Sequence, residues 1–234
     1  FGLFALAWNA RRYLDNHYLL FVGIGSAFVG FLDGLHLLAY RGMGVFSASD
    51  AADLPTQLWI AGRYVQVLAL LPATLFIRRR LPVGPVVAGF AAVTGLLLYW
   101  IFAGRSFPAC FVEGTGLTPF KVASEYVVCA LLALALVLLR RSRERLAPGT
   151  VRLLTVAMAA TIASELSFTL YADVYGVANV VGHLLKVAAF YALYRAVLES
   201  GLKRPYELLF RDLLARESHF RSLAEHSPDA ILRF

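Results

Sequence analysis

The sequence contains little charge and almost no cysteine. Only 16% of its 234 residues are Asp, Glu, Lys or Arg, where a soluble domain has about 25%. Apolar residues make up 59% of the chain, and the mean hydropathy is +0.68. A soluble core of this size could not bury so much apolar surface, which argues against a water-soluble enzyme. Cys110 and Cys129 lack the paired spacing of a zinc site and cannot form a disulfide framework, and we expect both to be free thiols.

The basic residues do not form a single patch. There are 22 Lys and Arg against 15 Asp and Glu, which gives a net charge of +7. The excess falls in short clusters between apolar runs, which is typical of a polytopic membrane protein and not of a nucleic-acid-binding protein.

Six apolar runs are long enough to cross a bilayer, which takes roughly 20 residues. They cover residues 17–41, 57–77, 82–104, 120–139, 151–172 and 177–199. Residues 1–9 are expected to be the end of a seventh helix. The sequence therefore predicts an all-α fold, a polytopic transmembrane helix bundle with six complete spans plus the end of a seventh.

The segments between these runs alternate in charge. One set is basic and consists of Arg11 and Arg12, Arg78 to Arg80, Arg140, Arg141, Arg143 and Arg145, and Lys203 with Arg204. The other set carries acidic residues, namely Asp50, Asp53, Glu113 and Asp173. The positive-inside rule predicts that the first set, and with it the C-terminus, lies in the cytoplasm. In the loop 105–119, Thr118 before Pro119 suits a helix N-cap followed by proline in the first turn.

Polar residues inside the predicted spans need an explanation, because charged groups there are costly and usually functional. Each of these residues falls in the outward half of its span at a helical rise of 1.5 Å per residue, and five spans contribute. The set predicts one polar layer that could bind a ligand: Asp33, His36, Trp59, Arg63, Gln66, Glu125, Glu165, Asn179, His183 and Lys186.

Three interpretations of this layer remain open. Three acids and two bases nearly neutralise one another, which fits a structural ion-pair lattice. The layer could also form a pocket for a small polar or amphipathic ligand. His36 and His183 could instead hold a transition metal or clamp a haem iron. Because an unpaired ammonium group is unfavourable in a bilayer, we expect Lys186 to pair with Glu165 or Glu125.

The chain beyond the last span continues into a second pattern. Gly201 and Pro205 predict that the last helix stops and restarts. From Tyr206, residues recur with the 3-4 spacing of a heptad seam, broken once by Arg216. This predicts a signalling helix through Tyr206, Leu209, Leu213, Phe220 and Leu223. The alternative is an amphipathic helix lying on the inner leaflet.

Several strings resemble those of one family of bacterial membrane-associated sensor domains, the third class of the MASE group. In chain order they are FLDGLHLLAYRGM (31–43), TQLWIAGRY (56–64), GLTPFK (116–121), SELSFT (164–169), GHLLK (182–186) and GLKRPYELLF (201–210). The resemblance covers about residues 1–215 and implies an input domain of sensor histidine kinases and diguanylate cyclases. Residues 217–234, ESHFRSLAEHSPDAILRF, resemble the opening of a PAS domain.

The predicted organisation is therefore a transmembrane sensor domain (1–200), a juxtamembrane signalling helix (201–217) and the start of a PAS domain (218–234). We expect a sensory input domain in the bacterial inner membrane, without catalytic residues of its own, that acts as a homodimer and passes a signal to a histidine kinase or cyclase. The alternative is a secondary transporter or channel, although no internal repeat is found and the polar layer lies off the midplane. A membrane enzyme is disfavoured because no catalytic motif is present.

Overall fold

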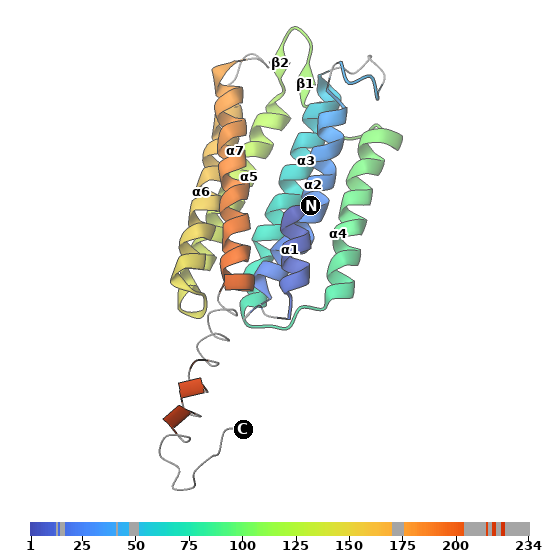
Figure 1. The fold of residues 1–234 in the computed structure, drawn as a ribbon. Coiled ribbons are helices and arrows are strands. Elements are labelled where there is room, and N and C mark those ends of the chain that lie inside the picture. Colours follow the sequence, from blue (N-terminus) through green and yellow to red (C-terminus); the bar gives the residue numbers. More distant parts are fainter. Residues whose placement is uncertain are drawn as a thin grey trace.

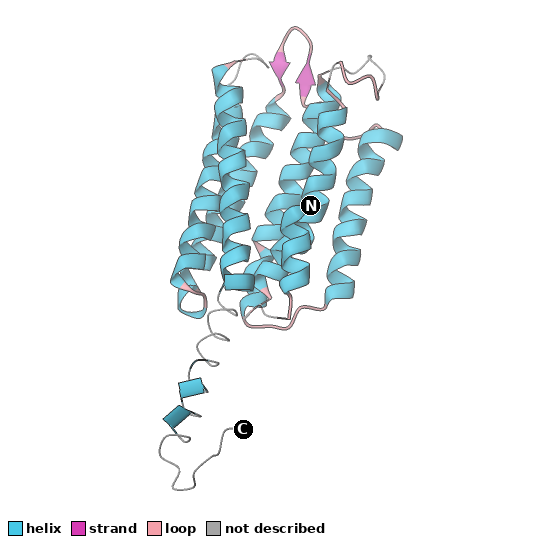
Figure 2. Ribbon diagram, viewed as in Figure 1, coloured by secondary structure: helices cyan, strands magenta, loops and turns pink. Residues whose placement is uncertain are grey.

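The computed structural model describes residues 1–12, 14, 17–40, 42–46, 52–169 and 176–203, and a few positions between 214 and 222. Within these residues the chain forms a bundle of seven α helices, with a two-stranded hairpin at one end (Figures 1 and 2). The predicted all-α fold is confirmed.

Six of the helices are long and apolar enough to cross a membrane. The seven helices are α1 (Gly2–Ala10), α2 (Tyr18–Leu38), α3 (Asp53–Leu70), α4 (Val83–Leu98), α5 (Pro119–Arg141), α6 (Pro148–Thr169) and α7 (Val177–Leu198). Three carry a different winding at their ends: a 3-10 turn after α3 (η2, Pro72–Ile77), a π turn after α4 (η3, Tyr99–Ala103) and a π turn after α7 (η5, Glu199–Lys203). Each predicted span corresponds to one of α2–α7, while the shorter α1 runs along only part of the bundle (Figure 1).

The bundle has two chemically different ends. The hairpin end holds β1 (Phe111–Val112) and β2 (Gly116–Leu117), which pair antiparallel, together with the starts of α3, α5 and α7. The arginine end holds the connections 78–82 and 142–147 and the end of α7 (Figure 1). Successive long helices run in alternate directions between these two ends, so the basic clusters gather at one of them.

Side chains at the helix starts hold the hairpin. The Thr118 hydroxyl accepts a hydrogen bond from the Lys121 amide at 3.3 Å and donates one to the Ala109 carbonyl at 2.7 Å. The predicted N-cap is therefore confirmed, with Pro119 in the first turn. The Asp53 carboxylate accepts hydrogen bonds from the amides of Cys110 (2.6 Å) and Phe111 (2.8 Å), which ties α3 to β1.

The apolar core lies mainly in the half of the bundle toward the arginine end. Its fully buried members include Leu132 and Leu139 of α5 and Leu154 and Ala157 of α6. By contrast, α4 buries only Phe90 and Thr94 and lies at the margin of the bundle (Figure 1). A peripheral helix that is apolar on its exposed side is expected where lipid, not water, is the solvent.

The predicted helix stop at Gly201 is wrong. Helical winding continues through Gly201 to Lys203 as the π turn η5. A Cβ atom at Gly201 would come within 2.7 Å of the Ala10 Cβ, so the glycine serves close packing against the end of α1 and does not end the helix. Ser200 in the same turn shares a hydrogen bond of 2.7 Å with Thr150 of α6.

The seam residues Tyr206, Leu209, Leu213 and Phe220, and most of 218–234, lie outside the described residues. The signalling helix, the PAS start and the domain boundaries therefore stay predictions.

Candidate functional site

A single carboxylate oxygen joins three helices in the polar layer. Asp33 Oδ1 on α2 accepts from Arg63 Nη2 on α3 at 2.8 Å and from Lys186 Nζ on α7 at 2.9 Å. The Arg63 side chain is fully buried, while that of Asp33 is 23% exposed. This ion-pair cluster therefore links α7 to α2 and α3.

The prediction that Lys186 pairs with Glu165 or Glu125 is wrong, because Lys186 pairs with Asp33. The Lys186 ammonium lies over the Trp59 ring, 3.8 Å from its centroid, while it contacts Asp33. Glu165 instead faces Arg63, at 3.9 Å. Arg63 also donates a hydrogen bond to Gln66 one turn further along α3.

Trp59 is the centre of an aromatic cluster in the same layer. The Arg63 guanidinium carbon lies 4.6 Å from its ring centroid, and two cations on one indole gain cation–π attraction. The rings of Phe168, His36 and His183 have centroids 4.6, 5.3 and 5.5 Å from that of Trp59. Both predicted histidines therefore contact the same indole.

Each histidine is oriented by a backbone carbonyl. His36 Nδ1 lies 2.7 Å from the Pro55 carbonyl oxygen, and His183 Nδ1 lies 2.9 Å from that of Asn179. Since a carbonyl oxygen only accepts, we assign the proton to Nδ1 in both rings, which leaves Nε2 as the acceptor. Among the described residues no group of three or more His, Cys, Asp or Glu side chains could hold a metal ion. A metal or haem at His36 and His183 thus stays a prediction without a further ligand from this part of the chain.

Lys121 belongs to the layer and was missed from the sequence. Its ammonium lies 2.7 Å from Glu125 Oε1 and donates to the Phe168 carbonyl oxygen at 2.8 Å, which links α5 to α6. A lysine one turn inside a span is easily taken for one that extends to the membrane surface. The Lys–Glu spacing of four was the signal that could have found it. With Lys121 the layer holds three acids and three bases.

Some buried polar atoms of this layer have no hydrogen-bond partner among the described residues. Besides the carboxylate oxygens of Glu125 and Glu165, they are His36 Nε2, Trp59 Nε1, Arg63 Nε and Ser124 Oγ. Buried polar atoms are nearly always paired. The layer therefore offers one acceptor and two donors on adjacent side chains of α2 and α3, which suits a small polar ligand.

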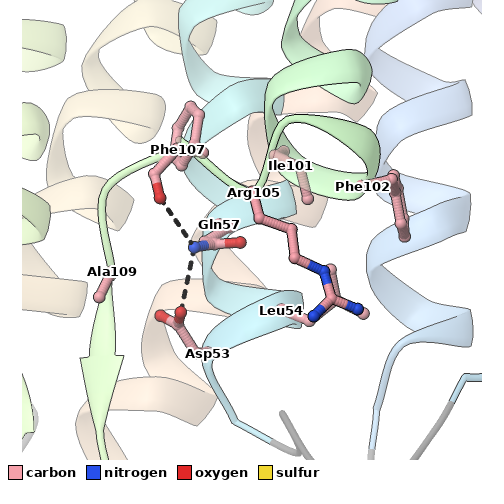
Figure 3. Close-up of a pocket in the computed structure, with 8 residues that line it drawn as sticks. All are labelled: Asp53, Leu54, Gln57, Ile101, Phe102, Arg105, Phe107 and Ala109. Carbon is pink, nitrogen blue, oxygen red and sulfur yellow. Dashed lines mark hydrogen bonds between the residues drawn. The ribbon is translucent and has the colours of Figure 1, made fainter.

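A cavity of about 350 Å³ lies at the hairpin end, between the start of α3, η3 and the loop that follows it (Figure 3). Its lining is Asp53, Leu54, Gln57, Ile101, Phe102, Arg105, Phe107 and Ala109. None of the ten predicted site residues lines it. Gln57 Nε2 donates to Asp53 Oδ2 at 3.0 Å and to the Phe107 carbonyl at 3.4 Å (Figure 3). Arg105 has φ 43°, in the left-handed region that non-glycine residues rarely adopt.

The cavity wall continues into a buried thiol. Cys110 is fully buried beside Asp53. Burial, and then the Asp53 charge, raise the pKa of the Cys110 thiol to about 12. Both cysteines are free thiols, as predicted, and both are buried.

A family model described as a membrane-associated sensor domain, MASE3, matches residues 1–205. Comparisons with curated proteins and with solved structures give no match.

Proposed function

The chain belongs to the family of membrane-associated sensor domains, and we propose that it is the sensory input domain of a bacterial receptor. In this proposal it lies in the cytoplasmic membrane and receives a signal from outside or from within the bilayer. It passes that signal to a cytoplasmic PAS domain and an output module, in the first instance a histidine kinase, with a diguanylate cyclase as the other output known from the family resemblance.

The proposed orientation has the arginine end in the cytoplasm. Three basic clusters lie in the connections of that end, whereas the loops at the hairpin end carry Asp53 and Glu113. An excess of Lys and Arg marks cytoplasmic loops. Reporter fusions after Arg80 and Arg145 should therefore be active in the cytoplasm, and fusions near Asp53 and Glu113 outside it. A reversal at either end would overturn the orientation.

The observation that carries the proposal is the shared oxygen of Asp33. It holds Lys186, on the helix that leads to the output module, to Arg63 on α3. A ligand shifts a receptor only by binding its two states differently. A ligand with an anionic or hydrogen-bonding group that competes for Lys186 would loosen α7 from α2 and α3 and change its position at the arginine end.

The proposed ligand-binding residues are the ten of the polar layer. Support comes from the unpaired polar atoms around Trp59 and from the partial exposure of Asp33, which stands nearer to solvent or lipid than Arg63 and Glu165 do. The ligand class that fits is a small polar or amphipathic molecule, because the layer is neutral in sum and has aromatic walls.

The test is Lys186→Met in the full-length receptor, with kinase or cyclase output measured in cells. We expect output that is locked, high or low, in protein that is still inserted. Adding Asp33→Asn should recover part of the regulation, because it removes the carboxylate charge that Lys186 had helped to balance. Adding Glu165→Gln in place of Asp33→Asn is the matched control and should recover none.

A second control tests whether the effect of Lys186→Met comes from the contact with α7 or from the loss of any buried lysine in the layer. Lys121→Met removes a buried lysine from the same layer, but one that pairs with Glu125 on its own helix and not with α7. It should leave the range of output intact. An unchanged response in Lys186→Met, or an equal loss in Lys121→Met, would contradict the proposed route through α7.

A further inference from the structure

The cavity at the hairpin end is lined by two opposite charges that do not pair with each other. Asp53 and Arg105 both line it, but Arg105 has no hydrogen bond or ion pair with any residue that the structure describes. Figure 3 shows the guanidinium on one side of the cavity, beside Leu54, and Asp53 with Gln57 on the other. The cavity therefore has a cationic side and an acceptor side.

The backbone on the cationic side is held in place around Arg105. Its φ of 43° lies in the left-handed region, which a residue with a Cβ atom adopts when the surrounding structure requires it. Gly104 N donates to the Tyr99 carbonyl at 2.7 Å. Ser106 N donates to the Trp100 carbonyl at 3.0 Å. Both acceptors belong to the π turn η3, and π turns are frequent at functional sites. The loop thus fixes the point from which the guanidinium extends.

On the acceptor side, the orientation of the Gln57 amide follows from its partners. Nε2 donates to the carbonyls of Phe107 at 3.4 Å and Pro108 at 3.3 Å, and also to Asp53 Oδ2 at 3.0 Å. Because all three partner atoms are acceptors, the amide nitrogen must face them, and Oε1 remains available to accept. Asp53 Oδ1 is held by two backbone amides of the hairpin end. The acceptors are therefore fixed before any ligand arrives.

The remaining wall of the cavity is mainly apolar. It consists of Leu54 of α3, Ile101 and Phe102 of η3, and Phe107 of the following loop. The volume of about 350 Å³ lies at the lower end of the range of small-molecule sites, which is about 300–1,000 Å³. A few fixed polar groups on apolar walls are typical of such sites. The cavity therefore suits one small molecule with an apolar body.

From this arrangement we infer that the cavity binds a small zwitterion with an apolar body, of the chemical class of the apolar α-amino acids. The ligand carboxylate accepts hydrogen bonds from the Arg105 guanidinium, whose fork matches it. The ligand ammonium donates to Gln57 Oε1 and Asp53 Oδ2, and the apolar body contacts Leu54 and Phe102. A plain anion is repelled by Asp53 and a plain cation by Arg105, so the two charges together select a ligand that carries both.

This site is separate from the polar layer, none of whose residues lines the cavity, and it goes beyond the proposed function. Phe107 lies in the cavity wall and also packs against the small apolar cluster that contains Trp59. The two sites are therefore neighbours. The test of the cavity measures binding and not output, so the cavity and the route through Lys186 can fail independently of each other.

The test is ligand binding to the purified full-length receptor in lipid nanodiscs, measured by titration with saturation-transfer difference NMR. L-leucine and L-phenylalanine are the probes with both charges. Isocaproate is leucine without its amino group, and isoamylamine is leucine without its carboxylate. We expect L-leucine to bind about tenfold or more tightly than either analogue, which is the effect of one charge-assisted contact. No binding of either amino acid at millimolar concentration, or equal affinity for isocaproate and L-leucine, would overturn the inference.

Arg105→Gly tests the cationic side without straining the loop, because glycine adopts a positive φ freely. It should weaken L-leucine binding by about tenfold or more. Isoamylamine should bind no worse than before, because the guanidinium that repels it is gone. Glu113→Gln changes a charge in the same loop outside the cavity lining, and it should leave both affinities unchanged. Equal losses of L-leucine binding in the two variants would show that the ligand binds elsewhere.

Asp53→Asn tests the acceptor side. The asparagine oxygen can still accept from the two backbone amides that hold Asp53, while the negative charge is lost. L-leucine should bind several-fold more weakly. Isocaproate should bind at least as well as to the unchanged receptor, because its carboxylate is no longer repelled. A parallel fall in the affinities of both ligands would overturn the assignment of the ligand ammonium to Asp53.

Discussion

The two halves of the bundle are held together by different kinds of contact. Toward the arginine end the core is apolar and mainly aliphatic, with Leu132 and Leu154 among its fully buried members. Toward the hairpin end, Trp59 and Phe168 belong to a second, smaller apolar cluster beside the ion pairs of Arg63. Aliphatic side chains are held by close packing and gain nothing by changing neighbours. A charged side chain, by contrast, can leave one partner and form an ion pair with another. Under the proposed function, the contacts that can change on ligand binding therefore lie in the polar half, and the contacts that stay fixed lie in the apolar half.

The strongest test of this contrast is Arg63→Met. It leaves Asp33 and Glu165 without their shared cation in a buried position, and breaking a buried pair costs about 3–5 kcal/mol of unfolding free energy. Unfolding of the purified domain in mixed micelles, followed by circular dichroism, measures the loss. Arg80→Met, at an exposed position of the arginine end, is the control and should cause no measurable change. A small effect of Arg63→Met would mean that the polar half is not held by its ion pairs.

In the apolar half, the free energy of unfolding should depend on the volume of the buried side chain that is removed. Leu132→Ala removes a fully buried side chain and should cost about 2–4 kcal/mol. Leu134→Ala, two residues further on the same helix, changes a side chain that is 47% exposed and should be close to neutral. The same unfolding assay compares them. Equal losses would contradict the assignment of these two faces of α5 to core and lipid.

Within the polar half, Lys186 should be coupled to Asp33 and not to Glu165. A double-mutant cycle of Lys186→Met with Asp33→Asn should give a coupling free energy of about 1–2 kcal/mol. The cycle of Lys186→Met with Glu165→Gln should give less than about 0.5 kcal/mol. Similar values in the two cycles would mean that Lys186 exchanges between both acids in the resting state.

The smallest expected effect concerns the cap of α5. Thr118→Ala removes the side chain that accepts from Lys121 N and donates to the Ala109 carbonyl, and should cost about 1 kcal/mol. Thr115→Ala, in the exposed tip of the hairpin, is the control and should be neutral. A larger loss for Thr118 would indicate that the hairpin and α5 unfold together with the polar layer.

The sequence was enough to predict the helices and the depth of the polar residues. Apolar run length located six spans, and helical rise alone predicted that Asp33, Arg63 and Lys186 would lie at similar depth. The structure joins these three at one carboxylate. The depth of a residue in the bundle depends only on its position along its own helix, so it can be predicted from the sequence of that helix alone.

Pairing within the layer could not be predicted, because it depends on how helices rotate and on which neighbours they have. Lys186 was expected beside Glu165 or Glu125 and instead pairs with Asp33, with its ammonium over the Trp59 ring. Lys121 was left out although it pairs with Glu125 four residues away. A glycine after a long apolar run is typical of a helix end. Gly201 instead allows close packing against Ala10, almost 200 residues earlier in the chain, which a local pattern cannot predict.

The buried thiol of Cys110 is a built-in probe of hairpin opening, because its labelling rate depends on how often it becomes exposed. Only a thiolate attacks a maleimide, and this thiol, with a pKa of about 12, is enclosed while Asp53 holds the amides of Cys110 and Phe111. A charged, membrane-impermeant maleimide therefore reacts only during the intervals in which the hairpin lifts away from α3, and does not reach Cys129 inside the bundle. The labelling rate thus reports the population of the open hairpin, and no cysteine has to be introduced for the measurement.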